Sequence, residues 1–288
     1  MNPIVRNLRF ELDESVPRYW HGRRRSVSMF LDNLSVFFPA GERFFVKAVR
    51  AHQAAVTDPE LELQVRAFCG QEGVHGREHE AYNALMQRHG YPIEEMEKKV
   101  EAILAGVTGR SSDELQLAVT CALEHFTALL GAMLLSRPQM LEGAHPAMAA
   151  LWKWHAAEEN EHKNVAFDVY KAAGGSYVVR AYTMIGATVI FWGKVIEQQA
   201  RMMKSAGILN SAKEWRDLLS FLFVNPGGMG ALLPLYFEYF RPGFHPSQID
   251  SNKLLDAWKA EFDESELYAK SVQAARAPRR TPSLAPAG

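Results

Sequence analysis

Apolar residues recur every three or four positions through most of the chain, and the alternation typical of strands is nearly absent. The pattern predicts one helix over residues 39–56 and another from a cap at residue 57 or 58 to about residue 90. Further helices are predicted over residues 93–106, from the "SSDE" cap to about residue 136, and from "HPAM" to "AAGG". Beyond residue 175, helices are expected to about 206, over 212–223 and over 251–268, with a broken region around "NPGGMG" and "RPGFHP". The sequence therefore predicts an all-α protein.

The breaks in this pattern divide the chain into three parts. Residues 1–25 form an N-terminal arm that ends in the basic "HGRRR", and residues 26–268 form one helical domain. Within that domain we expect a bundle over about residues 39–175 and accessory helices over 176–268. The tail, 269–288, is rich in Pro, Ala and Arg and is predicted to be disordered. With 48% hydrophobic and 23% charged residues, the chain can bury a sizeable core.

Charge and cysteine usage narrow the setting of the protein. A formal net charge of −1 gives no sign of nucleic-acid binding. Two cysteines, and a start without an apolar signal segment, indicate a reduced, cytoplasmic compartment. The uncharged run 181–193 is too short to span a bilayer, and the run 218–237 is interrupted by "NPGGMG". Neither is expected to span, although peripheral membrane contact through this Phe- and Leu-rich region stays open.

The stretch "WHAAEENEHKN", residues 154–164, concentrates acids and histidines on one predicted helix. At about 100° per residue, His155, Glu159 and His162 fall within one arc of about 60°. Glu158 and Glu161 point elsewhere and are expected on a charged outer face. Large apolar residues on neighbouring turns share the arc of the first three, so that face is expected to point inward.

Three other predicted helices carry matching residues. Glu72 and His75 repeat the Glu-x-x-His spacing, at which both side chains can reach one ion. Glu124 is the single Glu in the apolar run "AVTCALEHFTALLGAMLL", and Glu42 lies between pairs of phenylalanines in "FFPAGERFF". The resulting order of Glu, Glu-x-x-His, Glu, Glu-x-x-His is the arrangement that holds two iron or manganese ions in four-helix bundles.

Electrostatics favour the same interpretation. Four buried carboxylates would each lose several kcal/mol of solvation and would repel one another, whereas two divalent cations cancel their charge. Oxygen and imidazole ligands fit two iron ions, manganese or a mixed iron–manganese pair, and zinc less well because no thiolate set is present. Singly, Glu42 could complement a helix dipole, Glu124 could lie at a rim, and one Glu-x-x-His could be chance. As a set, the predicted metal ligands are Glu42, Glu72, His75, Glu124, His155, Glu159 and His162.

Several neighbours of these residues have open roles. His155, one turn before Glu159, is predicted as a third histidine ligand, with a core or ligand-contacting role as the alternative. His79 follows His75 by one turn and is expected to contact a ligand or to line the pocket. Glu158 and His125 point away from the ligand faces, so a surface position or a contact to a ligand is expected.

Small side chains and thiols also lie near the predicted site. Cys69 and Cys121 each precede a ligand Glu by three residues and are expected to be buried, inert thiols close to the metals. Thr127, Ala128 and Gly131 could leave a void beside the metals for substrate, or could allow close helix packing.

These residues resemble a bacterial family described as "predicted metal-dependent hydrolase", which is grouped with ferritin-like proteins. The matching segments are "LSVFFPAGERFF", "QEGVHGREHEAYN", "ALEHFTALL", "WHAAEENEHKNVAFDVY" and "YFRPGFHP", within roughly residues 20–250. The resemblance implies a ferritin-like four-helix bundle with additional C-terminal helices. The His-x-x-x-Glu-x-x-His at 155–162 is similar to that of the arylamine N-oxygenase di-iron enzymes, in which an added histidine completes a seven-ligand site.

The leading expectation is a di-iron enzyme that activates O2 to oxidise or oxygenate a hydrophobic or amphipathic small molecule, with an electron donor as a further partner. The alternative is a two-metal hydrolase that uses a metal-bound water. Iron storage or sensing is a third, less favoured hypothesis. No catalytic residue is predicted beyond the ligands, and a homodimer is expected.

Overall fold

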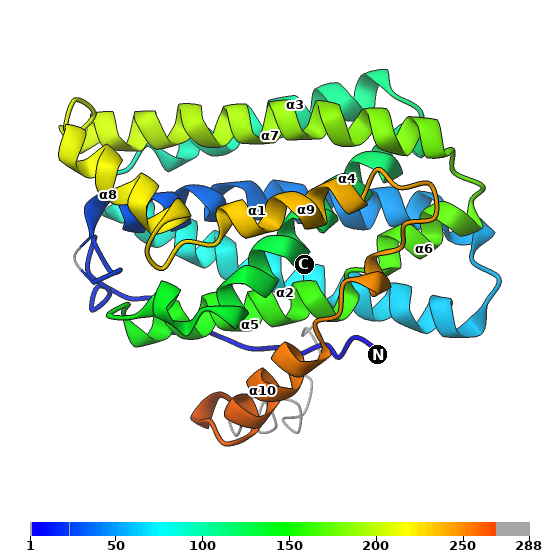
Figure 1. Ribbon diagram of the computed structural model, residues 1–288, viewed down its shortest axis with the longest axis horizontal. Helices are drawn as coiled ribbons and strands as arrows, with labels where there is room; N and C mark the ends of the chain where they lie inside the picture. Colours follow the sequence, from blue (N-terminus) through cyan, green and yellow to red (C-terminus); the bar gives the residue numbers. More distant parts are fainter. Residues whose placement is uncertain (1, 23, 269–288) are drawn as a thin grey trace, which may run out of the picture.

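The computed structural model describes residues 2–22 and 24–268, and this part of the chain is built from ten α-helices with no strand (Figure 1). The all-α prediction is therefore confirmed, whereas the tail predicted over 269–288 lies outside the described residues. The helices are α1 (Arg25–Ala51), α2 (Pro59–Arg88), α3 (Ile93–Arg110), α4 (Asp113–Ser136), α5 (Pro146–His162), α6 (Val165–Ala172), α7 (Tyr177–Ser205), α8 (Ala212–Phe223), α9 (Met229–Glu238) and α10 (Asn252–Asp263).

The predicted helix starts rest on capping side chains that the structure shows. The side chain of Asp58 accepts a hydrogen bond from the backbone N–H of Glu60, and Pro59 occupies the first turn of α2. Ser112 likewise accepts from the backbone N–H of Leu115 at the start of α4. These two starts agree with the sequence because each is encoded locally.

The predicted start of the first helix at residue 39 is wrong, since α1 begins at Arg25 and passes through Pro39. A proline inside a helix cannot donate to the carbonyl four residues earlier, here that of Ser35. The side-chain amide of Asn83 on α2 donates to this carbonyl at 3.4 Å. A tertiary contact therefore replaces the missing bond, and a local pattern could not reveal it.

Two further boundaries differ from the predictions. The helix expected from "HPAM" to "AAGG" is divided between α5 and α6 at Lys163 and Asn164, where the Lys163 ammonium donates to Ser251 Oγ at 2.8 Å. The region expected to be broken contains α9, which continues through Pro234. At the first of these boundaries, a contact with a distant segment accompanies the break.

Four helices carry the predicted ligands and pack together as a bundle: α1, α2, α4 and α5. His21 forms a backbone bridge with Ala144, so the start of α1 and the end of α4 lie at the same end of the bundle. These two helices therefore run in opposite directions. Helix α7 packs against α1 and α4, and Arg201 on α7 donates to Glu95 on α3 at 2.8 Å.

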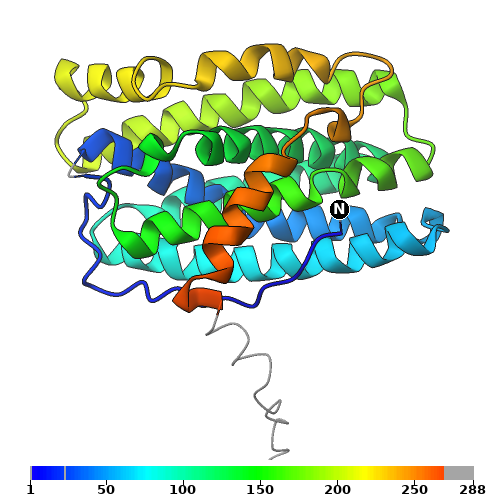
Figure 2. The ribbon, with the colours of Figure 1, turned by 60° about the horizontal axis from the view of Figure 1, so that its bottom comes forward.

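The non-helical segment before α1 lies along the bundle on the side of α2 and α5, and α10 crosses over it (Figure 2). A Cβ placed on Gly70 of α2 would lie 2.6 Å from Cγ2 of Val5, so a glycine there allows the segment to approach α2 closely. The guanidinium carbon of Arg6 lies 4.9 Å from the centroid of a Trp258 ring on α10. The N-terminal segment is thus held between α2 and α10.

Among the described residues, two helices are long and apolar enough to cross a membrane by length and composition alone, namely α4 and α7. The apolar window of α4 is 72% buried within the bundle, whereas that of α7 is only 22% buried. Apolar side chains on the outer face of α7 are exposed, among them Val178, Tyr182, Ile185, Val189, Ile190 and Ile196.

Candidate metal centre

All seven predicted ligand residues meet in the interior between α1, α2, α4 and α5. Each residue is at most 3% exposed. They form three overlapping groups in which the candidate ligand atoms all lie within 4.8 Å of one another. The groups are Glu42, His75 and His155; Glu72, His75 and Glu159; and Glu72, Glu124 and His162. That these residues bind metal stays a prediction, but the structure brings all seven to one place.

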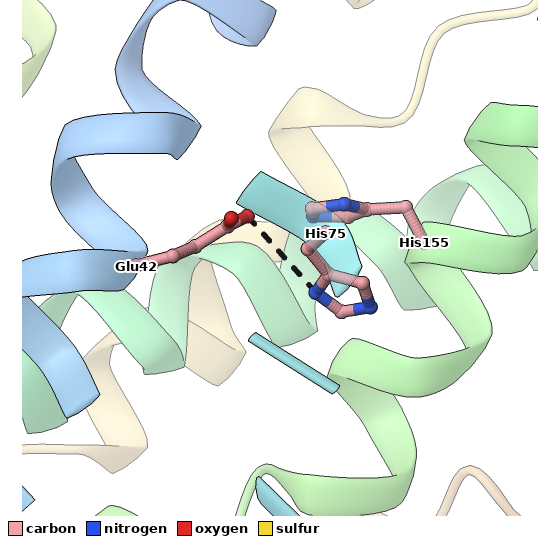
Figure 3. A group of neighbouring side chains, drawn as sticks. All are labelled: Glu42, His75 and His155. Atoms are coloured by element: carbon pink, nitrogen blue, oxygen red, sulfur yellow. Dashed lines mark ion pairs between the residues drawn. The ribbon is translucent and has the colours of Figure 1, made fainter. Parts of the chain in front are cut away.

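One end of the cluster consists of Glu42, His75 and His155, which converge from α1, α2 and α5 (Figure 3). Nδ1 of His75 lies 4.0 Å from Oε1 of Glu42 and 3.4 Å from Oε1 of Glu159. At this spacing a cation could lie between the side chains.

The other end consists of Glu72, Glu124 and His162. Nε2 of His162 lies 3.0 Å from Oε1 of Glu72 and 3.3 Å from Oε2 of Glu124. Oε1 of Glu159 lies between the two ends, 3.3 Å from Nε2 of His155 and 3.6 Å from Nε2 of His162. Glu159 is therefore placed where one carboxylate could bridge two ions.

The candidate ligand atoms lack hydrogen-bond partners, which tests whether the residues fit metals. Buried polar atoms are nearly always hydrogen-bonded, and each unpaired one costs about 1–3 kcal/mol. Here both carboxylate oxygens of Glu42, Glu72 and Glu124 are buried without a hydrogen-bond partner, as are one oxygen of Glu159 and one ring nitrogen of each histidine. An exclusively oxygen and nitrogen donor set of this kind fits two divalent cations.

Burial and neighbouring charges shift the pKa values of the clustered carboxyls in different directions. Burial raises the pKa of Glu124 to about 8, although the nearby His162 opposes the shift. Burial and then the charge of Glu72 raise the pKa of Glu42 well above its usual range. Burial also favours the neutral form of Glu159, but interactions with His162 outweigh it and hold the pKa of that carboxyl well below its usual range. Cations in the cluster would stabilise all of the carboxylates in their ionised form.

Each histidine keeps one ring nitrogen directed at the cluster because its other nitrogen has a partner outside it. Nε2 of His75 donates to Oε2 of Glu158 at 3.1 Å, and Nδ1 of His162 donates to Oε1 of Gln71 at 3.0 Å. Such partners fix the tautomer and the ring orientation of metal-binding histidines. The orientation of these two histidine rings is therefore fixed by Glu158 and Gln71, which are not candidate ligands themselves.

The partner of His155 is His79, as the sequence allowed. Nδ1 of His155 and Nε2 of His79 are 3.0 Å apart, and Nδ1 of His79 is 2.8 Å from Oγ of Ser35. Burial and then repulsion by His75 lower the pKa of His155 to about 3, so this ring is neutral. Nε2 of His155 has no hydrogen-bond partner, so the proton of this neutral ring is on Nδ1, which donates to Nε2 of His79. His79 in turn donates from Nδ1 to the hydroxyl of Ser35, and that hydroxyl donates to Oδ1 of Asn83.

The expectation of a charged outer face on α5 is wrong. Glu158 and Glu161 are 0% and 4% exposed because the N-terminal segment covers them. Arg6 donates to Oε1 of Glu158 at 3.0 Å and to both oxygens of Glu161 at 2.9 Å. Gln71 also donates to Glu161, at 3.0 Å, so Arg6 contacts the partner of His75 directly and is linked to Gln71, the partner of His162, through Glu161. Arg6 and Gln71 were missed: Gln71 adjoins Glu72 in the sequence, but nothing in the pattern places Arg6.

The remaining residues singled out in the sequence lie around the cluster. His125 is buried against the rings of Tyr239 and Phe244, away from the seven ligands. Cys121 is buried and Cys69 is half-buried, and burial raises the pKa of both thiols, in keeping with inert cysteines.

An apolar cavity adjoins the cluster on the side of α1 and α4. Its empty volume is about 1020 Å³, including the space at its mouth. Its lining is apolar apart from His155, Thr127 and the indole of Trp152, and the hydroxyl of Thr127 donates to the backbone of Glu124. The accessory helices contribute Phe191 on α7 and Phe221 on α8 to its wall.

The small residues of α4 were expected either to border a void or to allow close helix packing, and the structure shows both. Thr127 and Gly131 line the cavity, so they do border a void. A Cβ on Gly131 would lie only 2.8 Å from the backbone oxygen of Ala156, so this glycine also permits close packing of α4 on α5. Ala128 lies against α5, and its carbonyl accepts from Asn160 at 3.1 Å.

The fold and the buried Glu and His cluster define a helical protein equipped to bind metal. The chain belongs to the family described as predicted metal-dependent hydrolase, whose model matches residues 4–250. No curated protein and no solved structure is significantly similar to it. The family description agrees with the metal-dependent hydrolase alternative better than with the oxygen-activating expectation. The ferritin-like grouping and the likeness to arylamine N-oxygenases lie beyond this match.

Proposed function

We propose that the protein is a two-metal enzyme of the ferritin-like kind that uses O2 to oxidise a hydrophobic small molecule. The observation that carries the proposal is the double position of His155, which belongs to the candidate ligand cluster and also lines the apolar cavity. A molecule in that cavity would lie directly beside the metals. The seven ligand residues would hold two iron ions, and these would supply the redox chemistry for O2, with electrons from an external donor.

The lining of the cavity favours oxidation of C–H groups over cleavage of a polar bond. Among the described residues that line it there is no lysine, arginine or acid, and the polar side chains are those of His155, Thr127 and Trp152. A scissile carbonyl or phosphoryl group bound there would lose its hydration and gain few polar partners from the wall. The apolar wall also limits the access of water to the reacting group.

Hydrolysis is the second candidate function, and the family description favours it. The same ligand set could hold two zinc or manganese ions that polarise a scissile group. In that case the cavity would hold the apolar part of the substrate, and the bond to be cleaved would lie at the ligand cluster.

One experiment separates the two functions. The protein is loaded anaerobically with two equivalents of ferrous ion and mixed with O2, and O2 uptake and optical absorbance are followed. Zinc- and manganese-loaded samples are tested with p-nitrophenyl esters of alkanoic acids. We expect stoichiometric O2 uptake that is lost in Glu124→Ala and retained in Glu80→Ala, a matched change at an exposed residue of α2. Ester cleavage lost only in Glu124→Ala, without O2 uptake, would establish the hydrolase instead.

A further inference from the structure

The apolar cavity is long and follows one face of each of two antiparallel helices. Its lining on α1 extends from Phe30 to Phe45, fifteen residues, or about 22 Å at about 1.5 Å per residue. Its lining on α4 extends from Leu123 to Leu134, eleven residues, or about 16 Å. The lining therefore follows about four turns of α1 and about three turns of α4.

The two ends of the cavity differ in chemistry. Gly41, Thr127 and His155 lie at the end beside the candidate ligands. Because α1 and α4 are antiparallel, the start of α1 and the end of α4 form the far end, where Met140 and the α8 residue Phe221 complete the wall. That end is apolar throughout, so it suits the terminus of a hydrocarbon and no charged group.

Aromatic rings form much of the cavity wall. The ring of Phe38 lies 4.3 Å from that of His155, and the ring of Phe37 lies 5.2 Å from that of Phe191, measured between centroids. Phe126 stacks on Phe191 at 5.7 Å. Rings from α1, α4 and α7 are thus in contact within the wall, and a flexible chain can follow such an uneven wall by bond rotation, whereas a fused ring system cannot.

We infer that the substrate is an unbranched aliphatic molecule of roughly a dozen carbon atoms or more, since C–C bonds of about 1.5 Å advance an extended zigzag chain by about 1.3 Å per carbon. Its reacting end lies at His155 and its tail points toward Phe221. The orientation rests on the proposed function, because only a reaction at the metals requires one end to lie there. Binding of the chain itself does not depend on which reaction follows.

The test is the binding of straight-chain primary alcohols from six to fourteen carbons to the metal-free full-length protein, measured by calorimetry. Burial of each added methylene is expected to raise the affinity about four-fold until the cavity is filled. 1-Decanol is compared with 1-adamantanol, a compact alcohol with the same number of carbons, which we expect to bind at least ten-fold more weakly. An affinity independent of chain length, or equal binding of the two ten-carbon alcohols, would overturn the inference.

A substitution inside the cavity tests where the tail lies. Leu34→Trp fills the middle of the cavity, and Leu63→Trp is the matched control at an exposed position of α2. We expect only Leu34→Trp to shift the chain length of the tightest-binding alcohol, to chains several carbons shorter. If that chain length stays the same in Leu34→Trp, the tail does not lie along the inferred path through the cavity. If Leu34→Trp does not fold, Met133→Phe at the far end replaces it, and the wild-type series decides on chain binding in any case.

The inference and the proposed function fail in distinguishable ways. Metal-dependent O2 uptake without length-dependent alcohol binding overturns the inferred chain and leaves the enzyme class intact. Length-dependent binding without a metal-dependent reaction overturns the proposed function and leaves the chain-binding cavity in place.

Discussion

Each candidate histidine ligand is held by a residue that lies one step farther from the centre of the ligand cluster. For His75 this residue is Glu158, whose carboxylate also pairs with Arg6. A carboxylate acceptor both orients the imidazole and strengthens its donor nitrogen. The structure thereby gives Glu158 the ligand-contacting position that the sequence allowed, but in the interior rather than at the surface.

Replacing Glu158 by Gln is expected to weaken metal binding without removing a ligand. The amide keeps nearly the same shape but loses the charge that supports His75, and changes of this kind cost about 10- to 100-fold in metal affinity. Metal titration under anaerobic conditions measures the effect. Glu80→Gln, at an exposed site, serves as the control, and equal affinities of the two variants would contradict the assigned role.

A buried acid on α1 predicts how stability depends on pH. Asp32 accepts hydrogen bonds from Trp20 and Tyr82, yet burial raises its pKa from 3.8 to about 7. Between these values the folded state holds a proton that the unfolded chain has lost, so the contribution of Asp32 to stability falls as pH rises from about 4 to 7. At about 1.4 kcal/mol per pKa unit, the loss is on the order of 4 kcal/mol.

Urea unfolding of Asp32→Asn at pH 5 and pH 7.5 checks this expectation. The amide can still accept from Trp20 and Tyr82 but carries no buried charge, so the stability of the variant relative to the wild type should be higher at pH 7.5 than at pH 5. Asp256→Asn, at an exposed position of α10, should behave like the wild type. A stability difference between Asp32→Asn and the wild type that is the same at both pH values would contradict the argument.

At the scale of elements, the N-terminal segment acts as part of the site. Arg6 is the cation between two fully buried carboxylates, Glu158 and Glu161, and its own side chain is only 10% exposed. Removing one partner of a buried ion pair costs about 3–5 kcal/mol because the other charge stays unpaired. Lys259 on α10 also approaches Glu161, at 3.2 Å, so part of that charge keeps a partner.

Arg6→Ala is therefore expected to lower the free energy of unfolding by about 2–4 kcal/mol and to weaken metal binding as well. Chemical denaturation and metal titration provide the two measurements. The control is Arg9→Ala, which removes an exposed arginine from the same segment. If both variants kept wild-type stability, the segment would be a passive cover.

The sequence predicted those elements whose signals are local. Caps at Asp58 and Ser112 define helix starts, and the 3.6-residue period places each Glu and His on an inward face. The passage of α1 through Pro39 depends on Asn83, and the burial of Glu161 depends on Arg6. Both contacts join residues far apart in sequence, so no pattern along one helix could predict them.

At the scale of the whole molecule, the accessory helices complete the cavity, since α7 and α8 supply part of its wall. The homodimer, the peripheral membrane contact and the cytoplasmic location stay predictions. The exposed apolar face of α7 is the surface that a dimer or membrane contact would use.

Removal of metals is expected to destabilise the entire bundle, because the cluster joins four helices. A ligand present at about 100 times its dissociation constant stabilises the folded state by about 2.7 kcal/mol. For a chain of this size, chelation should then lower the melting temperature by roughly 5–10 °C. Calorimetry of a fully metal-loaded sample, before and after addition of a chelator, measures the shift. A melting temperature that the chelator leaves unchanged would be inconsistent with metal ligands on four helices.

The central claim is that seven buried residues on four helices hold two metal ions. The most direct test is elemental analysis of the wild type and of Glu124→Ala after anaerobic loading with ferrous ion and removal of unbound metal. We predict two metal ions per chain in the wild type and at most one in the variant, with an intact helical spectrum in both. Two full equivalents in Glu124→Ala, or none in the wild type, would contradict the claim.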